Sequence, residues 1–563
     1  MAEYLTLKTS DCKNCYKCIR HCPVKSIKFD HNHVHIILEE CILCGHCFVI
    51  CPQNAKEIRS DVAAAKALLQ SGSPVYVSLA PSFTANYNGL TIGSMERALK
   101  RLGFAGVEET AIGATIVKRQ YDALVNREEQ QVIISTCCPT INLLIQKYYP
   151  EAIPSTARVV SPMQAHCMDL KRRYPEAKTV FIGPCISKKA ESDSFSAGTV
   201  DCALTFVELS DWLKSKNIEL DETGAGTAEG ANENTRARLF PTNGGILRTM
   251  AKENPRYTYL AVDGIENCIR SIEDVVQGKL DRCFIEMSAC TGSCASGPVM
   301  QKNHEHPVRN YIAVNKYAGT GDFPVFEYND DKLLKELESL ALRKVHFGEK
   351  AIAEVLQKLG KTKPEHELNC GSCGYNTCRE KAQAVLEGKA TLTMCLPYLL
   401  GKAESFSDDI IKNTPNAIIV LNEDFEVQQI NTAACKLLNV APSNILGDPV
   451  VRILDPVPFL EVTQNGVNSY NKRVYLADYE KHVDETIIYD KSYRILMCIM
   501  RDVTEETALK EEKEIFNRKA VEITDKVIEK QMRAVQEIAS LLGETTAETK
   551  VALTKLKESL TDA

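Results

Sequence analysis

Three short apolar runs in the middle of the sequence predict buried β-strands. They cover residues 131–136, 178–182 and 283–285. Runs of this length, bounded by turn-forming residues, are typical of strands covered on both faces of a parallel sheet. Helices are predicted around them at residues 94–102, 140–149, 161–174 and 205–216. Strands that alternate with helices indicate a mostly parallel α/β core of two or three layers.

Local signals refine the ends of several of these elements. Ser94 is suited to cap the first helix, and Thr205 with Glu208 has the spacing of a capping box. Residues 61–72 predict a linking helix. Residues 219–236, rich in Gly, Ala, Thr and Glu, predict a mobile surface loop.

The pattern changes after residue 330. Residues 331–360 predict a pair of helices, and residues 413–504 predict an α+β domain without cysteine clusters. In that domain, strands are expected at 417–424 and 427–430, with a helix at 432–438. Cys435 and Cys498 are interpreted as core residues there.

The last part of the sequence predicts one long helix. Residues 505–542 are helical by composition, and apolar residues recur in them every seven positions. The repeat consists of Val521, Ile528, Val535 and Leu542. Because a repeat of seven is typical of a coiled coil, we expect a parallel homodimer. Gly543 ends the pattern, and a short terminal helix follows it.

Composition narrows the class of protein. A length of 563 residues predicts several domains, since single cores rarely exceed about 250–300 residues. No apolar run is long enough to span a bilayer, and the formal charge of −7 argues against nucleic acid as a partner. The 23 cysteines are the unusual feature. With no secretion signal at residues 1–5, we expect a cytoplasmic protein whose thiols bind metal rather than form disulfides.

Two cysteine runs near the amino terminus predict a pair of iron–sulfur clusters. Each has the spacing Cys-x2-Cys-x2-Cys-x3-Cys-Pro, the bacterial two-cluster ferredoxin pattern, in which the fourth cysteine binds the other cluster. One [4Fe-4S] cluster is therefore assigned to Cys12, Cys15, Cys18 and Cys51, and the other to Cys41, Cys44, Cys47 and Cys22. Zinc would not explain the prolines. Residues 31–35, rich in histidine, are interpreted as a polar hairpin turn rather than a metal site.

A third cysteine group lies near residue 380. It consists of Cys370, Cys373, Cys378 and Cys395. Four thiolates in one short segment suit a further [4Fe-4S] cluster, and the segment resembles a small cluster-binding domain of anaerobic redox proteins. A structural zinc site is the alternative that the spacing leaves open.

The three central strands each end in cysteine. Their ends read Ser135-Thr136-Cys137-Cys138-Pro139, then Pro184-Cys185-Ile186-Ser187-Lys188 with Glu191, then Glu286-Met287-Ser288-Ala289-Cys290 with Cys294. Open α/β sheets place their ligands at the carboxyl ends of strands. These three segments resemble the signature motifs of [FeFe]-hydrogenases, and the resemblance covers roughly residues 74–315. The family reading implies an α/β H-cluster domain.

The resemblance also implies ligands and roles. Cys138, Cys185, Cys290 and Cys294 would hold the [4Fe-4S] part of an H-cluster, and Cys294 would bridge to a diiron unit carrying CO, CN⁻ and a dithiolate. Lys188 would donate a hydrogen bond to a cyanide, and Glu191 would pair with Lys188 or a neighbour. Cys137 would transfer protons as an exposed, reversibly ionised thiol. The alternatives are a surface ion pair for Lys188 and Glu191 and a structural thiol for Cys137.

The sequence departs from the family at the pocket. Gly183, before Pro184, and Ser288 stand where methionines usually pack against the diiron unit, so a looser and more polar pocket is expected. Tyr121 and Leu124 stand where the proton-exit helix usually has glutamates. Neither can shuttle a proton at neutral pH, since tyrosine has a pKa of about 10. Slow turnover is the consequence.

Together these features predict five domains. Residues 1–60 form a ferredoxin-like 2[4Fe-4S] domain, 74–330 the H-cluster domain, 331–402 a small helical [4Fe-4S] domain, 407–504 a domain that resembles PAS sensors, and 505–563 a signalling coiled coil. The favoured function is an H2-sensing, low-turnover hydrogenase that signals to a separate output protein. The alternatives are a fast hydrogenase with a ferredoxin-like redox partner, and a non-catalytic hydrogenase-like protein of iron–sulfur assembly.

Overall fold

The computed structural model describes residues 4–561, except 88–89, 195–197, 221–234, 301–305, 329, 344 and 543–545. Most of the loop expected over residues 219–236 therefore lies outside the described residues. The chain divides into two compact units, Met1–Tyr398 and Leu399–Ala563, and each is described by itself. In the described part of the chain, no helix is both long enough and apolar enough to cross a membrane.

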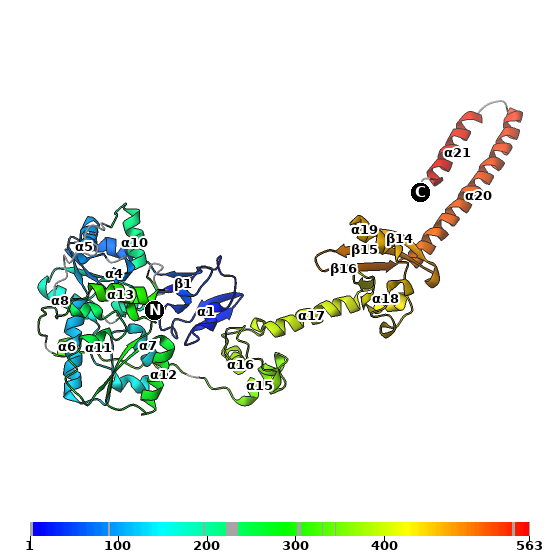
Figure 1. The fold of residues 1–563 in the computed structure, drawn as a ribbon. Helices are drawn as coiled ribbons and strands as arrows, with labels where there is room; N and C mark the ends of the chain where they lie inside the picture. The colour runs from blue at the N-terminus through cyan, green and yellow to red at the C-terminus, as the bar shows by residue number, and fades with distance from the viewer. Residues whose placement is uncertain are drawn as a thin grey trace. The chain divides into compact units, whose positions relative to one another are not determined.

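The amino-terminal module is built from two short antiparallel strand pairs (Figure 1). β1 (Leu5–Leu7) pairs with β4 (Lys56–Ile58), and β2 (Ile27–Asp30) pairs with β3 (His33–Ile36). His31 has a φ of 47° and Asn32 a φ of 62°, as a two-residue hairpin turn requires. The hairpin predicted for this histidine-rich segment is confirmed. Single-turn helices complete the module: α1 (Lys17–Arg20) and α2 (His46–Val49).

The mostly parallel α/β core that the sequence predicted consists of two parallel sheets. The first has the order β6 (Gly106–Glu109), β5 (Val75–Leu79), β8 (Lys178–Gly183), β9 (Cys202–Thr205). The second has the order β10 (Thr258–Asp263), β11 (Cys283–Ser288), β7 (Val132–Ile134). Alternation along the sequence predicts the strands but not their neighbours, because pairing is decided by long-range packing.

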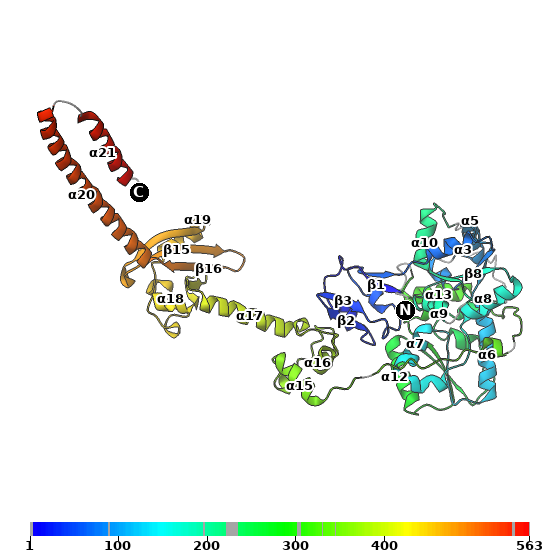
Figure 2. The same cartoon turned by 180° about the vertical axis from the view of Figure 1, so that it is seen from behind.

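Helices surround both sheets, and α5, α6, α8 and α10 lie on the periphery of the domain in both views (Figures 1 and 2). Thr205 caps α10 through the predicted capping box, and Ser161, where a helix was predicted to begin, caps α8 in the same way. The cap of α5 is Thr91 rather than Ser94. The helices are α3 (Val62–Leu69), α4 (Phe83–Asn86), α5 (Ile92–Arg101), α6 (Ala111–Arg127), α7 (Pro139–Tyr148), α8 (Pro162–Arg173), α9 (Ser187–Ser194), α10 (Phe206–Ser215), α11 (Gly245–Thr249), α12 (Ile265–Val276) and α13 (Pro307–Tyr317).

The helix pair predicted over residues 331–360 is only half formed. α14 is a single turn, Asp330–Leu333, and α15 covers Glu349–Lys358. Between them, residues 334–342 lie against the central domain. The amide of Lys335 donates to the carbonyl of Arg158, and the amide of Leu340 donates to the carbonyl of Gln146. This segment is extended because its backbone is bonded to another part of the fold, which no local pattern encodes.

The third cysteine group flanks α16 (Cys378–Leu386): Cys370 and Cys373 lie between α15 and α16, Cys378 is the first residue of α16, and Cys395 directly precedes α17 (Leu396–Asn413). This segment packs on the amino-terminal module. Arg20 donates to the carbonyls of Gly371 and Ser372 at 3.0 and 3.2 Å, and the amide of Phe29 donates to the carbonyl of Lys389. The two modules therefore share an interface.

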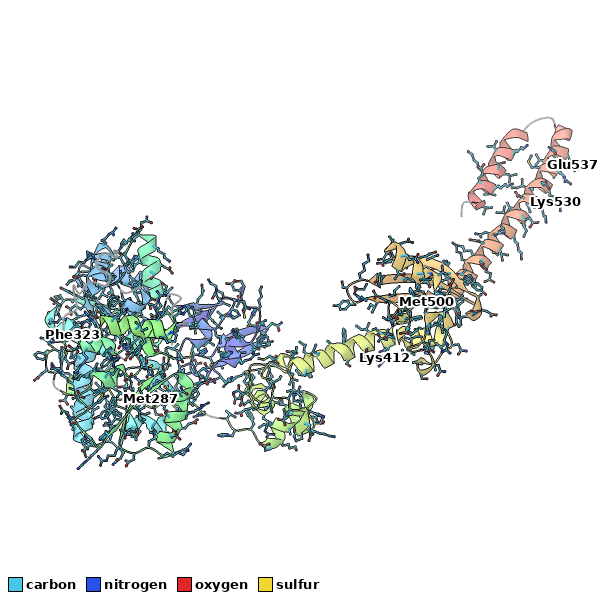
Figure 3. All side chains as sticks on the ribbon, in the orientation of Figure 1. Met287, Phe323, Lys412, Met500, Lys530 and Glu537 are labelled. Carbon is cyan, nitrogen blue, oxygen red and sulfur yellow. The ribbon has the colours of Figure 1, made fainter. Side chains whose placement is uncertain are left out.

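The second unit contains a five-stranded antiparallel sheet in the order β13-β12-β16-β15-β14. Its apolar face is covered by helices around a separate core, which includes Cys498 and Met500. Met500 is labelled in Figure 3. Cys435 is half-buried. The elements are β12 (Ala417–Leu421), β13 (Val427–Ile430), α18 (Thr432–Leu437), α19 (Val457–Asn465), β14 (Ser469–Leu476), β15 (Lys481–Asp490) and β16 (Ile495–Asp502).

The last two helices form a hairpin within one chain. α20 covers Thr504–Leu542, and α21 (Thr546–Thr561) contacts it, with Lys557 3.1 Å from the carboxylate of Asp525. The predicted heptad positions Val521, Ile528 and Val535 are half-buried in this single chain. Part of the stripe expected to face a second copy is thus covered by α21.

Candidate active site

The cysteine-bearing strand ends of the central domain open into one cavity of about 110 Å³. The residues that line it include the four thiols assigned to one cluster from the sequence: Cys138, Cys185, Cys290 and Cys294. Four other predicted site residues line the same cavity: Cys137, Pro184, Lys188 and Ser288. Met287, another of the lining residues, is labelled in Figure 3. The fold brings these residues together from three segments far apart in the sequence.

The first segment is held by the turn between β7 and α7. Cys138 is the last residue before α7, and Pro139 occupies the first turn, where its missing N–H costs no hydrogen bond. The Asn142 side chain donates to the carbonyl of Thr136 at 3.0 Å. The turn is therefore fixed on both sides of the two thiols.

The second and third segments are fixed by hydroxyl and carboxylate contacts. Cys185 Sγ lies 3.1 Å from Ser187 Oγ, which lies 2.9 Å from Thr140 Oγ1 on α7. Gly292 has a φ of 79°, and its amide donates to the carboxylate of Asp263 at 2.6 Å. Glycine favours this left-handed conformation, which turns the chain between Cys290 and Cys294 back toward the cavity.

The thiols are close enough to influence one another. Burial raises the pKa of Cys290 well above its usual range, and the charges of Cys185, Cys294 and Cys138 raise it further. Burial and the same neighbours also raise the pKa of Cys294. Among the described residues, no three His, Cys, Asp or Glu side chains converge on a point suited to a single metal ion. The thiols instead line the walls of a larger space.

Two orphaned hydroxyls test whether the cavity suits a polar organometallic group. Ser82 Oγ and Ser293 Oγ both belong to cavity-lining residues, are buried, and have no hydrogen-bond partner in the described structure. Buried hydroxyls normally have partners, because an unpaired one costs about 1–3 kcal/mol. A bound group with acceptor atoms would supply those partners. The donor set therefore fits an iron–sulfur cluster with a polar ligand-bearing group beside it.

Gly183 does not line the cavity, contrary to the prediction. A Cβ on Gly183 would lie 2.6 Å from the Phe181 ring, so the ring fills the space that a side chain would need. Phe181 lines the cavity itself, together with alanines, prolines and Met163. The expectation of a more polar pocket is thus wrong for most of the wall. It holds only near Ser288 and the two orphaned hydroxyls.

Lys188 and Glu191 form a buried ion pair rather than a surface one. Lys188 Nζ lies 2.6 Å from the Glu191 carboxylate, and Lys335 Nζ lies 2.7 Å from its other oxygen. Burial alone would raise the pKa of Glu191, but the two ammonium groups outweigh it and lower the pKa to about 2. Sequence reasoning missed Lys335, because it lies 144 positions away in a segment predicted to be helical.

Cys137 forms a hydrogen bond with Tyr121, the residue that the family resemblance places at a proton-exit position. The Tyr121 hydroxyl lies 3.1 Å from Cys137 Sγ and accepts a hydrogen bond from the Thr136 amide at 3.1 Å. Burial raises the pKa of Cys137 to about 12. Cys137 is thus half-buried rather than exposed as predicted, and burial favours its protonated form.

The path beyond Tyr121 is apolar. The Tyr121 ring is fully buried among Val117, Val125 and Phe284, with Leu124 packed against the same cluster. Burial also raises the pKa of Tyr121 well above its usual range. The route from Cys137 toward α6 ends at this ring, as the sequence indicated.

A second cavity lies next to the first. Its lining includes the four cysteines predicted for the second ferredoxin cluster, namely Cys22, Cys41, Cys44 and Cys47. Cys44 lines both cavities, and its charge contributes to the raised pKa of Cys290. The two predicted cluster sites are thus neighbours, which is the arrangement that electron transfer needs.

Of the other two predicted cluster sites, the first is supported by contacts among some of its cysteines, and the second by a cavity that all four of its cysteines line. Cys12 and Cys15 lie close enough to Cys18 to raise its pKa to about 11, although burial is the larger cause. Their predicted partner Cys51 accepts a hydrogen bond from the Ala55 amide. The third group lines a cavity of its own, formed by Cys370, Cys373, Cys378 and Cys395.

A substitution at Gly45 tests whether the segment that carries the second ferredoxin cluster site packs closely on the central domain. It has a φ of 74°, and a Cβ there would lie 2.6 Å from Pro298 and 2.9 Å from Ile186 of the central domain. Gly45→Ala is expected to lower the free energy of unfolding by about 1–3 kcal/mol more than Gly72→Ala, as overpacking does. Gly72 has the same backbone conformation but open space around it. Equal effects in chemical denaturation would contradict the close docking.

Comparisons with known proteins agree with this arrangement. Residues 73–298 match the family "Iron only hydrogenase large subunit, C-terminal domain", residues 5–52 match a 4Fe-4S dicluster domain, and residues 367–397 match an Fe-S cluster family. Iron hydrogenase 1 of Clostridium pasteurianum is 24% identical over 283 residues, which are 40% of this chain and 49% of that protein. The chain thus spans about half the length of that relative.

Other relatives were also found. The periplasmic [Fe] hydrogenase large subunit of Nitratidesulfovibrio vulgaris is 26% identical over 44% of this chain and 72% of that protein. The cytosolic Fe-S cluster assembly factor NAR1 of Candida dubliniensis is 26% identical over 31% of this chain and 36% of that protein. The solved structure of [FeFe]-hydrogenase HydA1 from Chlamydomonas reinhardtii shares 20% identity over 50% of this chain and all of that one, with a TM-score of 0.40.

The cysteine-lined cavities and the matched segments define an iron–sulfur protein with a 4Fe-4S dicluster domain at its amino terminus. Its central part is an iron-only hydrogenase large-subunit domain, and the chain is homologous to the [FeFe]-hydrogenases.

Proposed function

We propose that this protein is a cytoplasmic, low-turnover [FeFe]-hydrogenase that senses H2. The observation that carries the proposal is the single cavity, which gathers four thiols, Cys137 and the end of the Lys188–Glu191 ion pair. When bound, an H-cluster would supply the metal site at which H2 is split or formed. Cys138, Cys185, Cys290 and Cys294 would hold its [4Fe-4S] part.

The chain's own residues have distinct tasks at this site. Lys188 lines the cavity and would donate a hydrogen bond to a bound group, and Glu191, 2.6 Å from its ammonium, keeps it charged and in place. Burial opposes the charge on Lys188, but Glu191 outweighs it and raises the pKa of Lys188. Cys137 holds a proton at the cavity wall. Its blocked path at Tyr121 supports slow turnover.

Three further [4Fe-4S] clusters would connect the cavity to the rest of the protein. Cys44 lies between the H-cluster site and one ferredoxin site, and Arg20 bonds the ferredoxin module to the segment that carries Cys370 and Cys373. Electrons would move along these sites. The redox state would then reach the five-stranded domain, which we propose is a PAS sensor, and a separate output protein.

Infrared spectroscopy tests the function directly. The protein, reconstituted with iron and sulfide and loaded with a synthetic diiron cofactor, is expected to show CO and CN⁻ bands and slow H2 oxidation or evolution. Bands without any H2 turnover would contradict the hydrogenase assignment. Fast turnover with reduced ferredoxin would favour an ordinary catalytic hydrogenase with a regulatory domain.

A non-catalytic role in iron–sulfur assembly is the second candidate, because the Candida assembly factor is among the relatives. That role needs cluster-binding cysteines but no diiron unit. Cys137 and the buried Lys188–Glu191 pair have no task in it, and the orphaned hydroxyls of Ser82 and Ser293 would remain unpaired. Failure to take up the diiron cofactor would favour this candidate.

Homodimerisation through α20 is part of the proposal. The heptad residues of α20 are half-buried by α21, and apolar residues outside the stripe, such as Phe516 and Ile523, are exposed. We expect a dimer of the full-length protein in light scattering. A monomer at micromolar concentration would refute dimerisation through this helix.

A further inference from the structure

Four hydrogen-bonded side chains lead from the active-site cavity to the outside of the central domain. Thr110, at the start of α6, lines the cavity, and its hydroxyl lies 2.8 Å from the Ser78 hydroxyl on β5. Ser78 Oγ lies 2.8 Å from His166 Nδ1 on α8. His166 Nε2 lies 3.3 Å from Glu108 Oε2 on β6. We call this series the Thr110–Glu108 relay.

The ionised carboxylate of Glu108 sets which atom donates in the hydrogen bonds of the relay. Burial would raise its pKa, but His166 and Arg173 outweigh it and lower the pKa to about 2. Glu108 is therefore a carboxylate that only accepts, so His166 donates from Nε2, and the neutral form of the ring then accepts at Nδ1. Ser78 must then donate to His166 and accept from Thr110. The Thr110 oxygen is left with acceptor capacity on the cavity side.

The inner side chains of the relay are buried, and the side chain at its outer end is partly exposed. Ser78 and His166 are both fully buried, and Thr110 is 6% exposed. The Glu108 side chain is 24% exposed and is held by Arg173. Gly113 allows the close packing of α6 on α8, since a Cβ there would lie 2.6 Å from the His166 amide. A proton inside the relay can therefore leave only along it.

Other polar contacts near this cavity lead into the interior of the domain. The bond from Cys137 to Tyr121 ends in an apolar cluster. Glu191 is buried between two lysines, and Glu286 accepts from the Leu247 amide in the interior. A hydrogenase with this cavity still has to exchange two protons with solvent for each H2.

We propose that Thr110, Ser78, His166 and Glu108 conduct protons between the H-cluster cavity and solvent, with His166 accepting a proton at one ring nitrogen and releasing one from the other. This inference rests on the proposed hydrogenase function. Cys137 holds a proton inside the cavity, and the relay exports it. Two charged groups face His166. Glu108 on β6 is hydrogen-bonded to the ring, and Arg173 on α8 binds Glu108 through one end of its guanidinium.

The transfer balances without any other reactant. Thr110 accepts a proton on its oxygen and passes its own hydroxyl proton to Ser78. Ser78 passes its proton to His166 Nδ1, and His166 releases the Nε2 proton to Glu108, which gives it to water. One proton enters and one leaves. The two hydroxyls and the imidazole must then turn back to their starting orientation before the relay carries a second proton in the same direction.

Substitution of His166 is the main test in the cofactor-loaded protein. His166→Gln keeps hydrogen-bonding capacity but cannot ionise, and it is expected to lower H2 turnover at least tenfold. After a pH jump, the shift of the CO and CN⁻ bands should slow by a similar factor, while iron content and band intensities stay the same. Thr110→Val, at the cavity end, should act in the same way. Thr179→Val, which removes a buried hydroxyl outside the relay, is the matched control.

A second measurement does not depend on the cofactor. Deuterium exchange at the imidazole carbon of His166, followed by mass spectrometry in full-length protein without the diiron unit, should be detected in the wild type and be at least tenfold slower in Glu108→Gln, because Glu108 links this buried ring to solvent. Equal exchange in the two proteins, or wild-type band kinetics in His166→Gln, would overturn the relay. Absence of H2 turnover in the wild type together with slower exchange in Glu108→Gln would instead count against the proposed function alone.

Discussion

Replacing Cys137 by alanine is expected to lower H2 oxidation and evolution by about 10²–10⁴-fold, the usual contribution of a positioned acid–base group. Cys137 lines the cavity but is not one of the four predicted ligands, so the cluster should still assemble. The measurement is turnover of the cofactor-loaded protein, with iron content and infrared bands recorded on the same sample. A variant that turns over normally would remove Cys137 from the proton path.

Two matched variants separate the roles of the thiol and its partner. Cys137→Ser places a hydroxyl near Tyr121, and a hydroxyl is a far weaker acid than a thiol. Its H2 turnover should therefore be nearly as slow as that of Cys137→Ala. Tyr121→Phe removes the 3.1 Å bond to Cys137 and keeps the buried ring. Because the path beyond Tyr121 is apolar, Tyr121→Phe should retain most of the turnover. Loss of the cubane in Cys137→Ala would show that the ligand assignment is wrong.

Glu191→Gln is expected to lower the free energy of unfolding by about 3–5 kcal/mol, the cost of removing one partner from a buried ion pair. It leaves the ammonium groups of Lys188 and Lys335 close together and without their carboxylate. Chemical denaturation of the full-length protein measures the change. The central domain should show the loss, because both lysines belong to it.

Lys335→Met tests the same network from the residue that the sequence did not reveal. It keeps the Lys188–Glu191 pair, so its effect should be smaller than that of Glu191→Gln. In the double variant the two effects should not add, because both changes act on one network. Additive effects would show that Lys335 acts independently of Glu191.

The pH dependence of the wild type follows from the same carboxylate. The pKa of Glu191 falls from its ordinary value near 4.5 to about 2 on folding. Its contribution is therefore fully present above about pH 4.5 and is lost as the pH falls toward 2. A shift of this size corresponds to about 3 kcal/mol. Glu191→Gln should flatten the acid limb of the stability curve, and an unchanged limb would contradict the assignment.

Much of this protein was determined by local sequence patterns. The spacing of the cysteine runs predicted which thiols would meet, and Cys22 does line one cavity with Cys41, Cys44 and Cys47. The three apolar runs predicted strands that end in cysteine, because strand burial and turn chemistry are encoded within a few residues. The capping box at Thr205 was predictable for the same reason.

The contacts between distant segments were decided only by the tertiary structure. Lys335 pairs with Glu191, Tyr121 bonds Cys137, and His166 connects Thr110 to Glu108 through Ser78. Each of these links joins residues whose neighbours in sequence carry no signal of the partner. A buried polar side chain must find its hydrogen bond wherever packing places one, and packing depends on the whole fold. The identity of the predicted metal ligands thus follows from the sequence, whereas the hydrogen-bonded paths for protons are formed only in the folded chain.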